Sequence, residues 1–120
     1  MTTNLHNHML DRLGEAIIAF DPTNDRILAA NPAACSLYGQ SQDSLLNGRF
    51  SALHPRQLPS LVVFSEAVMD KGRAWTRSLS LVDDQGKTRP LEYLAALMPW
   101  QQGTAIVAVV SDLEAVRRRA

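Results

Sequence analysis

The chain of 120 residues has a single cysteine, Cys35, and no excess of either charge. One cysteine excludes an internal disulfide and a zinc site built on several cysteines. The 12 basic and 12 acidic residues cancel, so no overall field attracts nucleic acid or an anionic membrane surface. We therefore expect that this domain binds neither nucleic acid nor a membrane.

Long apolar segments are absent as well. The longest apolar run, residues 105–110, is far too short to cross a bilayer. The first residues lack the basic and then apolar pattern of a secretion signal. These absences predict a cytoplasmic location.

The sequence also lacks the motifs of common catalytic sites. It has no nucleophile elbow, no glycine-rich phosphate loop and no carboxylate pair at catalytic spacing. His6 and His8 would lie on different faces of a helix, and no third metal ligand stands near them. We predict that the chain is not an enzyme and holds no metal.

The most informative segment that is present runs from residue 21 to the glycine at position 39. Asn31 is a good helix N-cap, Pro32 suits the first helical position, and the glycine suits a left-handed helix stop. Residues 15–21 are apolar on both faces, which is typical of a strand covered on two sides. A turn joins this strand to residues 26–30, so the pattern predicts a hairpin followed by a short helix.

The rest of the chain predicts helices followed by three strands. Ser41 caps a short helical turn, and a longer amphipathic helix is expected at residues 59–71. Beyond it the period changes to two, which predicts a half-buried strand with one face formed by Trp75, Arg77, Leu79 and Leu81. Strands at residues 91–98 and 104–111 follow, and the last should be central because it has no polar face.

This order predicts an α+β fold with a five-stranded antiparallel sheet and its helices on one face. The first and last strands, apolar on both faces, should lie side by side. We divide the chain into an N-terminal helix at residues 1–13, a sensor domain at 14–112 and the start of an exit helix at 113–120. We expect the chain to stop inside a longer helix.

The N-terminal helix is amphipathic, because Leu5, Met9 and Leu13 recur at four-residue steps. This stripe is either a small satellite of the core or half of a dimer contact. We favour the dimer contact, because a helix before a small sheet has few places in its own chain to bury an apolar face.

The chain resembles a PAS domain from about residue 13 to residue 113. The segments that carry the resemblance are Asn31-Pro32-Ala33-Ala34, Leu37-Tyr38-Gly39, Ser44-Leu45-Leu46-Asn47-Gly48-Arg49, Leu53-His54-Pro55 and the turn Asp83-Asp84-Gln85-Gly86. The resemblance implies a sensor that dimerises through the helix before its first strand. It also implies a C-terminal effector, such as the histidine kinase of a two-component system, a cyclic-dinucleotide enzyme or a transcriptional activator.

The resemblance also bears on cofactors and on signal transmission. Haem-binding relatives use a histidine of the long helix, which has none here, and His54 precedes a proline in an extended segment. Flavin photoreceptors carry a reactive cysteine at the stretch matching residues 47–51, where this chain has none, and Cys35 is expected as a small buried residue. We expect neither haem nor flavin, and the cofactor stays unknown.

Relatives often end the last strand with Asp-Ile-Thr, which makes Asp112 the expected signal-transmitting residue.

The leading hypothesis is a non-enzymatic sensory and dimerisation module at the N-terminus of a larger signal-transduction or transcription-regulatory protein. A small ligand or partner between the sheet and the long helix would favour one of two packings. Apolar positions on the expected inward faces give the candidate lining: Ile18, Phe50, Phe64, Val68, Leu79, Tyr93 and Val109. Tyr93 is the expected polar anchor, because a buried hydroxyl requires a partner. Two alternatives stay open, a ligand-free interaction and dimerisation module and a small α+β enzyme.

Overall fold

The computed structural model describes residues 14–83 and 85–115. The predicted N-terminal helix with Leu5, Met9 and Leu13 lies outside these residues, as does the part of the predicted exit helix beyond residue 115. Within the described part, no helix is long and apolar enough to span a membrane.

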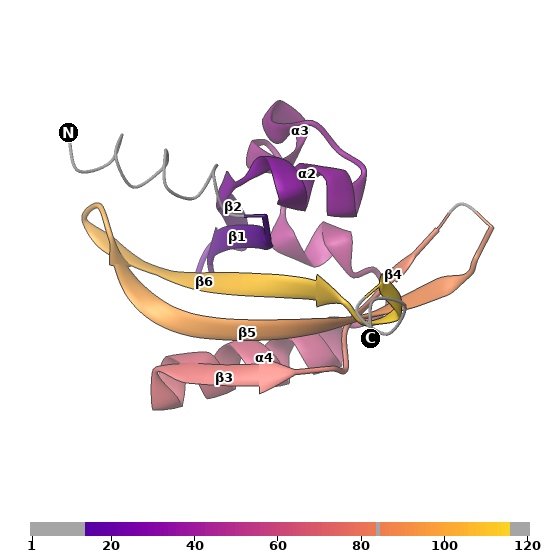
Figure 1. Cartoon of the computed structure of the whole chain (residues 1–120). Coiled ribbons are helices and arrows are strands. Elements are labelled where there is room, and N and C mark those ends of the chain that lie inside the picture. Colours follow the sequence, from indigo (N-terminus) through magenta and orange to yellow (C-terminus); the bar gives the residue numbers. More distant parts are fainter. Residues whose placement is uncertain (1–13, 84, 116–120) are drawn as a thin grey trace.

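Six antiparallel strands form one open sheet in the order β2-β1-β6-β5-β3, with β4 paired to β5 (Figure 1). The predicted neighbourhood of the first and last strands is confirmed, because Ile18 pairs with Ala108. The strands are β1 (Ala16–Asp21), β2 (Arg26–Ala30), β3 (Arg73–Thr76), β4 (Ser80–Val82), β5 (Thr88–Trp100) and β6 (Gly103–Asp112).

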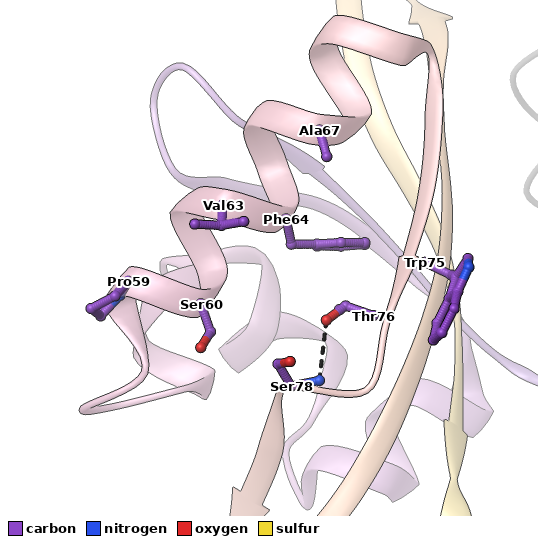
Figure 2. A pocket seen from close by; sticks show the side chains of 8 residues that line it. All are labelled: Pro59, Ser60, Val63, Phe64, Ala67, Trp75, Thr76 and Ser78. Carbon is purple, nitrogen blue, oxygen red and sulfur yellow. Dashed lines mark hydrogen bonds between the residues drawn. The ribbon is translucent and has the colours of Figure 1, made fainter.

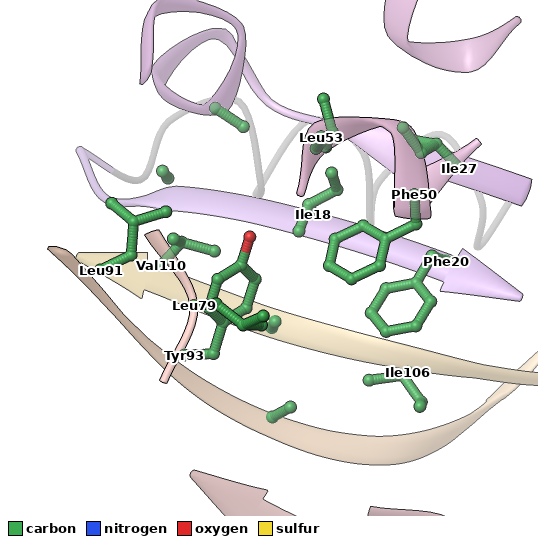
Figure 3. Packing of buried hydrophobic residues seen from close by; sticks show 14 of the residues in the cluster. Ile18, Phe20, Ile27, Phe50, Leu53, Leu79, Leu91, Tyr93, Ile106 and Val110 are labelled. Atoms are coloured by element: carbon green, nitrogen blue, oxygen red, sulfur yellow. The ribbon is translucent and has the colours of Figure 1, made fainter. Parts of the chain in front are cut away.

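The helices cover one face of the sheet. They are α2 (Pro32–Tyr38), α3 (Gln42–Leu46), the 3-10 helix η1 (Phe50–Leu53) and α4 (Leu58–Lys71). Each of the four contributes buried side chains to the same core cluster as alternate residues of the sheet. Figure 3 shows part of this packing, with Phe50 of η1 beside Phe20 and Ile18 of β1. The predicted α+β arrangement is therefore confirmed, and α4 agrees with the long helix expected at residues 59–71.

Asn31 explains why α2 begins where it does and why it lies close to β1. Its Oδ1 accepts the backbone N–H groups of Ala34 and Ile17, each at 2.9 Å. Its Nδ2 donates to the carbonyl of Glu15 at 2.7 Å. The N-cap that the sequence predicts thus also joins the helix to the first strand.

The single strand predicted at residues 75–81 is broken in the structure. β3 ends at Thr76, which pairs with Tyr93, and β4 begins at Ser80, which pairs with Pro90. Between these two pairs the chain advances four residues from Thr76 to Ser80, whereas β5 spans only three, from Tyr93 to Pro90. The segment between β3 and β4 therefore holds one extra residue, as in a β-bulge.

The extra residue reverses the alternation of side chains. Trp75 is 64% exposed, whereas Leu79 is fully buried. Arg77 lies with Trp75, its guanidinium 5.8 Å from the indole ring, and Leu81 packs against the core with Leu79. The prediction that all four share one face was wrong, because a period of two does not survive an inserted residue.

Val109 lies on the opposite face of the sheet from the core. It pairs with Ile17 and Leu94, whereas its neighbour Val110 pairs with the core residue Tyr93 and lies in the core cluster. The predicted inward position of Val109 was wrong. In an all-apolar strand the sequence offers no polar face to distinguish inside from outside, so the pairing with neighbouring strands decides it.

Candidate functional site

Aromatic side chains fill the space between the sheet and α4. The rings of Phe20 and Phe50 are stacked with centroids 3.9 Å apart. Tyr93 contacts Phe50 and Phe64 edge to face, each with centroids 5.9 Å apart. Figure 3 shows the ring of Tyr93 standing on β5 with its hydroxyl pointing away from the sheet. These contacts make the centre of the domain a packed aromatic cluster.

A chain of hydrogen bonds crosses this apolar cluster. The hydroxyls of Tyr38 on α2 and Tyr93 on β5 lie 2.6 Å apart. The Tyr93 hydroxyl lies 2.6 Å from Nε2 of His54, and Nδ1 of His54 lies 3.0 Å from the carbonyl oxygen of Ser80. This series of hydrogen bonds therefore connects α2, the segment after η1, β4 and β5.

The direction of this chain follows from its last acceptor. The carbonyl of Ser80 can only accept, so Nδ1 of His54 carries the proton. Burial lowers the pKa of His54, outweighing the hydrogen bond to Ser80, which raises it, so the ring is neutral at pH 7. Nε2 then accepts from Tyr93, and Tyr93 accepts from Tyr38. Burial raises the pKa of both phenols, so both keep the protons that the chain requires.

The backbone groups of Ser80 are free to join this series of hydrogen bonds because of the position of Ser80 in the pairing of β4 with β5. The N–H of Leu91 donates to the carbonyl of Leu79 at 3.1 Å, so the next position, Ser80, does not bond to β5. Its N–H instead donates to Oε1 of Gln57 at 2.8 Å. Its carbonyl accepts from Nε2 of Gln57 and from His54, both at 3.0 Å. The side chains of Gln57 and His54 therefore satisfy the backbone hydrogen-bonding groups of Ser80 at this edge of the sheet.

Six of the seven predicted lining residues lie in the one core cluster: Ile18, Phe50, Phe64, Val68, Leu79 and Tyr93. Cys35 is partly buried against the same cluster on α2. The sequence interpretation missed Tyr38 and weighed His54 only as a haem ligand. The signal for both was weak, because nothing local predicts that residues 38, 54 and 93 will meet.

Asp112 closes β6 and begins the segment that follows it. Its Oδ1 accepts the N–H groups of Glu114 and Ala115 at 3.0 and 3.2 Å, as an N-cap does. Its Oδ2 accepts from the guanidinium of Arg89 on β5. Burial alone raises the pKa of Asp112, but the hydrogen bonds from Arg89 and the two amides outweigh it, and the net pKa is lowered.

Two grooves flank α4. One, of about 330 Å³, lies between α4 and β3 and is lined by uncharged side chains, among them Val63, Phe64 and Trp75 (Figure 2). In the same view the N–H of Ser78, in the irregular segment between β3 and β4, donates to Oγ1 of Thr76 at the end of β3. The other groove, of about 430 Å³, lies on the opposite side of α4 toward β1 and η1.

Comparisons with known proteins give a match to one family model and several solved structures of similar fold. A family model described as "PAS domain" matches residues 14–115. The fold is similar to that of a PAS domain from a two-component sensor histidine kinase, with 14% identity and a TM-score of 0.75 over 92% of this chain and 96% of that one. No curated protein matches the sequence significantly.

Two further solved structures are similar. The PAS domain of nitrogen regulation protein NR(II) from Vibrio parahaemolyticus has 21% identity and a TM-score of 0.73, covering 90% of this chain and 97% of that one. A domain of the sensory box sensor histidine kinase/response regulator from Geobacter sulfurreducens has 21% identity and a TM-score of 0.67, covering 90% and 92%. At these identities the likeness establishes the shared fold.

Proposed function

The chain belongs to the PAS domain family, and on this premise we propose that it is a non-enzymatic sensory and dimerisation module of a larger signal-transduction or transcription-regulatory protein. A change of packing in the core would pass through Asp112 to a C-terminal effector, such as a histidine kinase, a cyclic-dinucleotide enzyme or a transcriptional activator. The observation that carries the proposal is the double role of the Asp112 carboxylate, which bonds both to Arg89 of the sheet and to the amides that follow the sheet.

A continuous series of contacts supports this route. His54 bonds to Tyr93 in the core and to Ser80 on β4. The next residue of β4, Leu81, pairs with Arg89, which bonds to Asp112. A rearrangement around Tyr93 would therefore alter the position of β4, then that of Arg89, and then the cap of the exit segment.

Nuclear magnetic resonance tests this route directly. The substitution Tyr93→Phe should shift the amide signals of Glu114 and Ala115 in the otherwise unchanged protein. In an Asp112→Ala background the same substitution should leave these two signals where Asp112→Ala alone puts them. Equal shifts in both backgrounds would show that the signal does not pass through this carboxylate.

The proposal has two versions, which differ in what changes the packing of the core. In the first, a small ligand enters between the sheet and α4 and displaces part of the aromatic cluster. In the second, the module is free of ligand and acts only through protein contacts, and the packed stack of Phe20 and Phe50 favours this form. Native mass spectrometry of the purified protein distinguishes them, because a retained ligand adds a fixed mass to each protomer.

Dimerisation is the remaining part of the proposal. PAS domains commonly dimerise, and the stripe of Leu5, Met9 and Leu13 is the proposed contact. Replacing Leu5 and Met9 by glutamate should convert a dimer to a monomer in sedimentation. A dimer that persists in this variant would place the contact elsewhere.

A further inference from the structure

The second groove along α4 is apolar at its base and along its helix rim. Phe20, Phe50 and Leu61 line it from the core side. Leu58, Val62 and Met69 line it from α4 and are 57%, 43% and 49% exposed. Large apolar side chains exposed together along one groove are typical of a protein-binding surface.

The spacing of the helix rim is that of a helix-pairing seam. Leu58, Val62, Ser65 and Met69 all line the groove and follow one another at steps of four, three and four residues. These are the steps of the a and d positions in a heptad, along which a second helix can lie. From Leu58 to Met69 this seam runs for about 17 Å along the helix axis. A seam of about three turns matches a second helix better than a compact small molecule.

The charges of this groove have one sign. Asp25 and Glu66 line it, and neither lysine nor arginine is among its lining residues. The carboxylate of Asp25 is fixed in place, because Oδ1 accepts the N–H of Ser51 at 3.0 Å and Oδ2 accepts its hydroxyl. A carboxylate offers about four acceptor positions, so Asp25 retains capacity for a cation.

We propose that this groove binds an amphipathic α-helix of a partner protein, with apolar side chains at heptad spacing and lysine or arginine beside them. The apolar seam supplies the contact area, and the two acidic side chains select basic flanks. A second copy of the same face is a poorer occupant, because it would bring acidic groups together without a basic counterpart.

Binding of two synthetic helices tests the proposal. Both carry leucine at the a and d positions, and the flanking e and g positions carry lysine in one peptide and glutamate in the other. Fluorescence anisotropy should give the lysine peptide about tenfold higher affinity for the unchanged protein. Glu66→Lys should remove this preference or reverse it. Val62→Glu should weaken the lysine peptide by about tenfold or more.

Val63→Glu is the matched control. Val63 is the next residue of the same helix and is 69% exposed, but it lines the uncharged groove on the other side. It should leave the affinity unchanged. Equal affinity for both peptides, binding of neither, or the same loss in Val63→Glu as in Val62→Glu would overturn the proposal. A self-association in sedimentation that Val62→Glu abolishes would instead make a second copy the occupant.

Discussion

The hydroxyl of Tyr93 donates to Nε2 of His54 across 2.6 Å, and both side chains are buried between the sheet and the helices. Every buried side-chain nitrogen or oxygen in the described part of the chain has a hydrogen-bond partner, so this pair belongs to a fully satisfied interior. A satisfied buried network favours one packing of the core, whereas a broken one is costly.

Removing the Tyr93 hydroxyl should therefore lower the stability of the domain by more than the loss of one small group suggests. Tyr93→Phe leaves Nε2 of His54 and the Tyr38 hydroxyl without their partner, and we expect the free energy of unfolding to fall by about 1–3 kcal/mol. Tyr38→Phe is the control, because Tyr93 can still donate to His54 and the loss should be smaller. Urea denaturation of both variants measures the difference, and equal losses would contradict the direction assigned to the chain.

Stability should depend on pH through His54. Its pKa in the folded protein lies below the ordinary value of 6.5, so below that pH the unfolded chain binds a proton that the folded chain does not. The free energy of unfolding should be highest above pH 6.5 and fall toward pH 5 by up to about 1.4 kcal/mol per pH unit. In His54→Gln this part of the slope should disappear. An unchanged slope in that variant would assign the effect to other groups.

The stacked pair at the centre of the core should be sensitive to truncation. Phe50 is 1% exposed and contacts Phe20, His54 and Tyr93, so Phe50→Ala opens a cavity and should cost about 3–5 kcal/mol. Trp75→Ala removes a larger but exposed side chain and should cost well under half as much. Chemical denaturation of the two variants ranks them, and a larger effect at Trp75 would be incompatible with this packing.

Asn31 should matter more than an ordinary helix cap. Asn31→Ala removes the cap of α2 and also leaves the N–H of Ile17 without this acceptor in the core, so we expect a loss of about 2 kcal/mol or more. Ser41→Ala is the comparison, because Ser41 caps α3 at an exposed site and serves only Ser44. Its cost should be about 1 kcal/mol. Thermal unfolding of both variants should show the larger shift at Asn31.

The two roles of Asp112 should separate by substitution. Asp112→Asn keeps an oxygen that can cap the following amides but loses the charge that Arg89 neutralises, whereas Asp112→Ala loses both. Amide hydrogen exchange at Glu114 and Ala115 should therefore rise strongly in the alanine variant and less in the asparagine variant. Equal exchange in the two variants would mean that the ion pair alone holds this segment.

Much of the fold could be predicted from sequence, because the deciding interactions are local. The ends of α2 are defined by Asn31 and Pro32 at its start and by Gly39 at its end, through capping interactions that involve only residues near in sequence. The apolar stretch of β1 and the amphipathic pattern of α4 are likewise periodic features of a single segment. The resemblance to a PAS domain rests on these same segments.

The sequence by itself determined which segments become helices and strands and which faces of most of them are apolar. Only the tertiary structure decided the inserted residue between Thr76 and Ser80, the outward side of Val109, and the meeting of Tyr38, His54 and Tyr93. Each of these depends on the register between strands or on contacts between residues distant in the chain. Local propensity carries no information about such pairings, since they exist only once the sheet has formed.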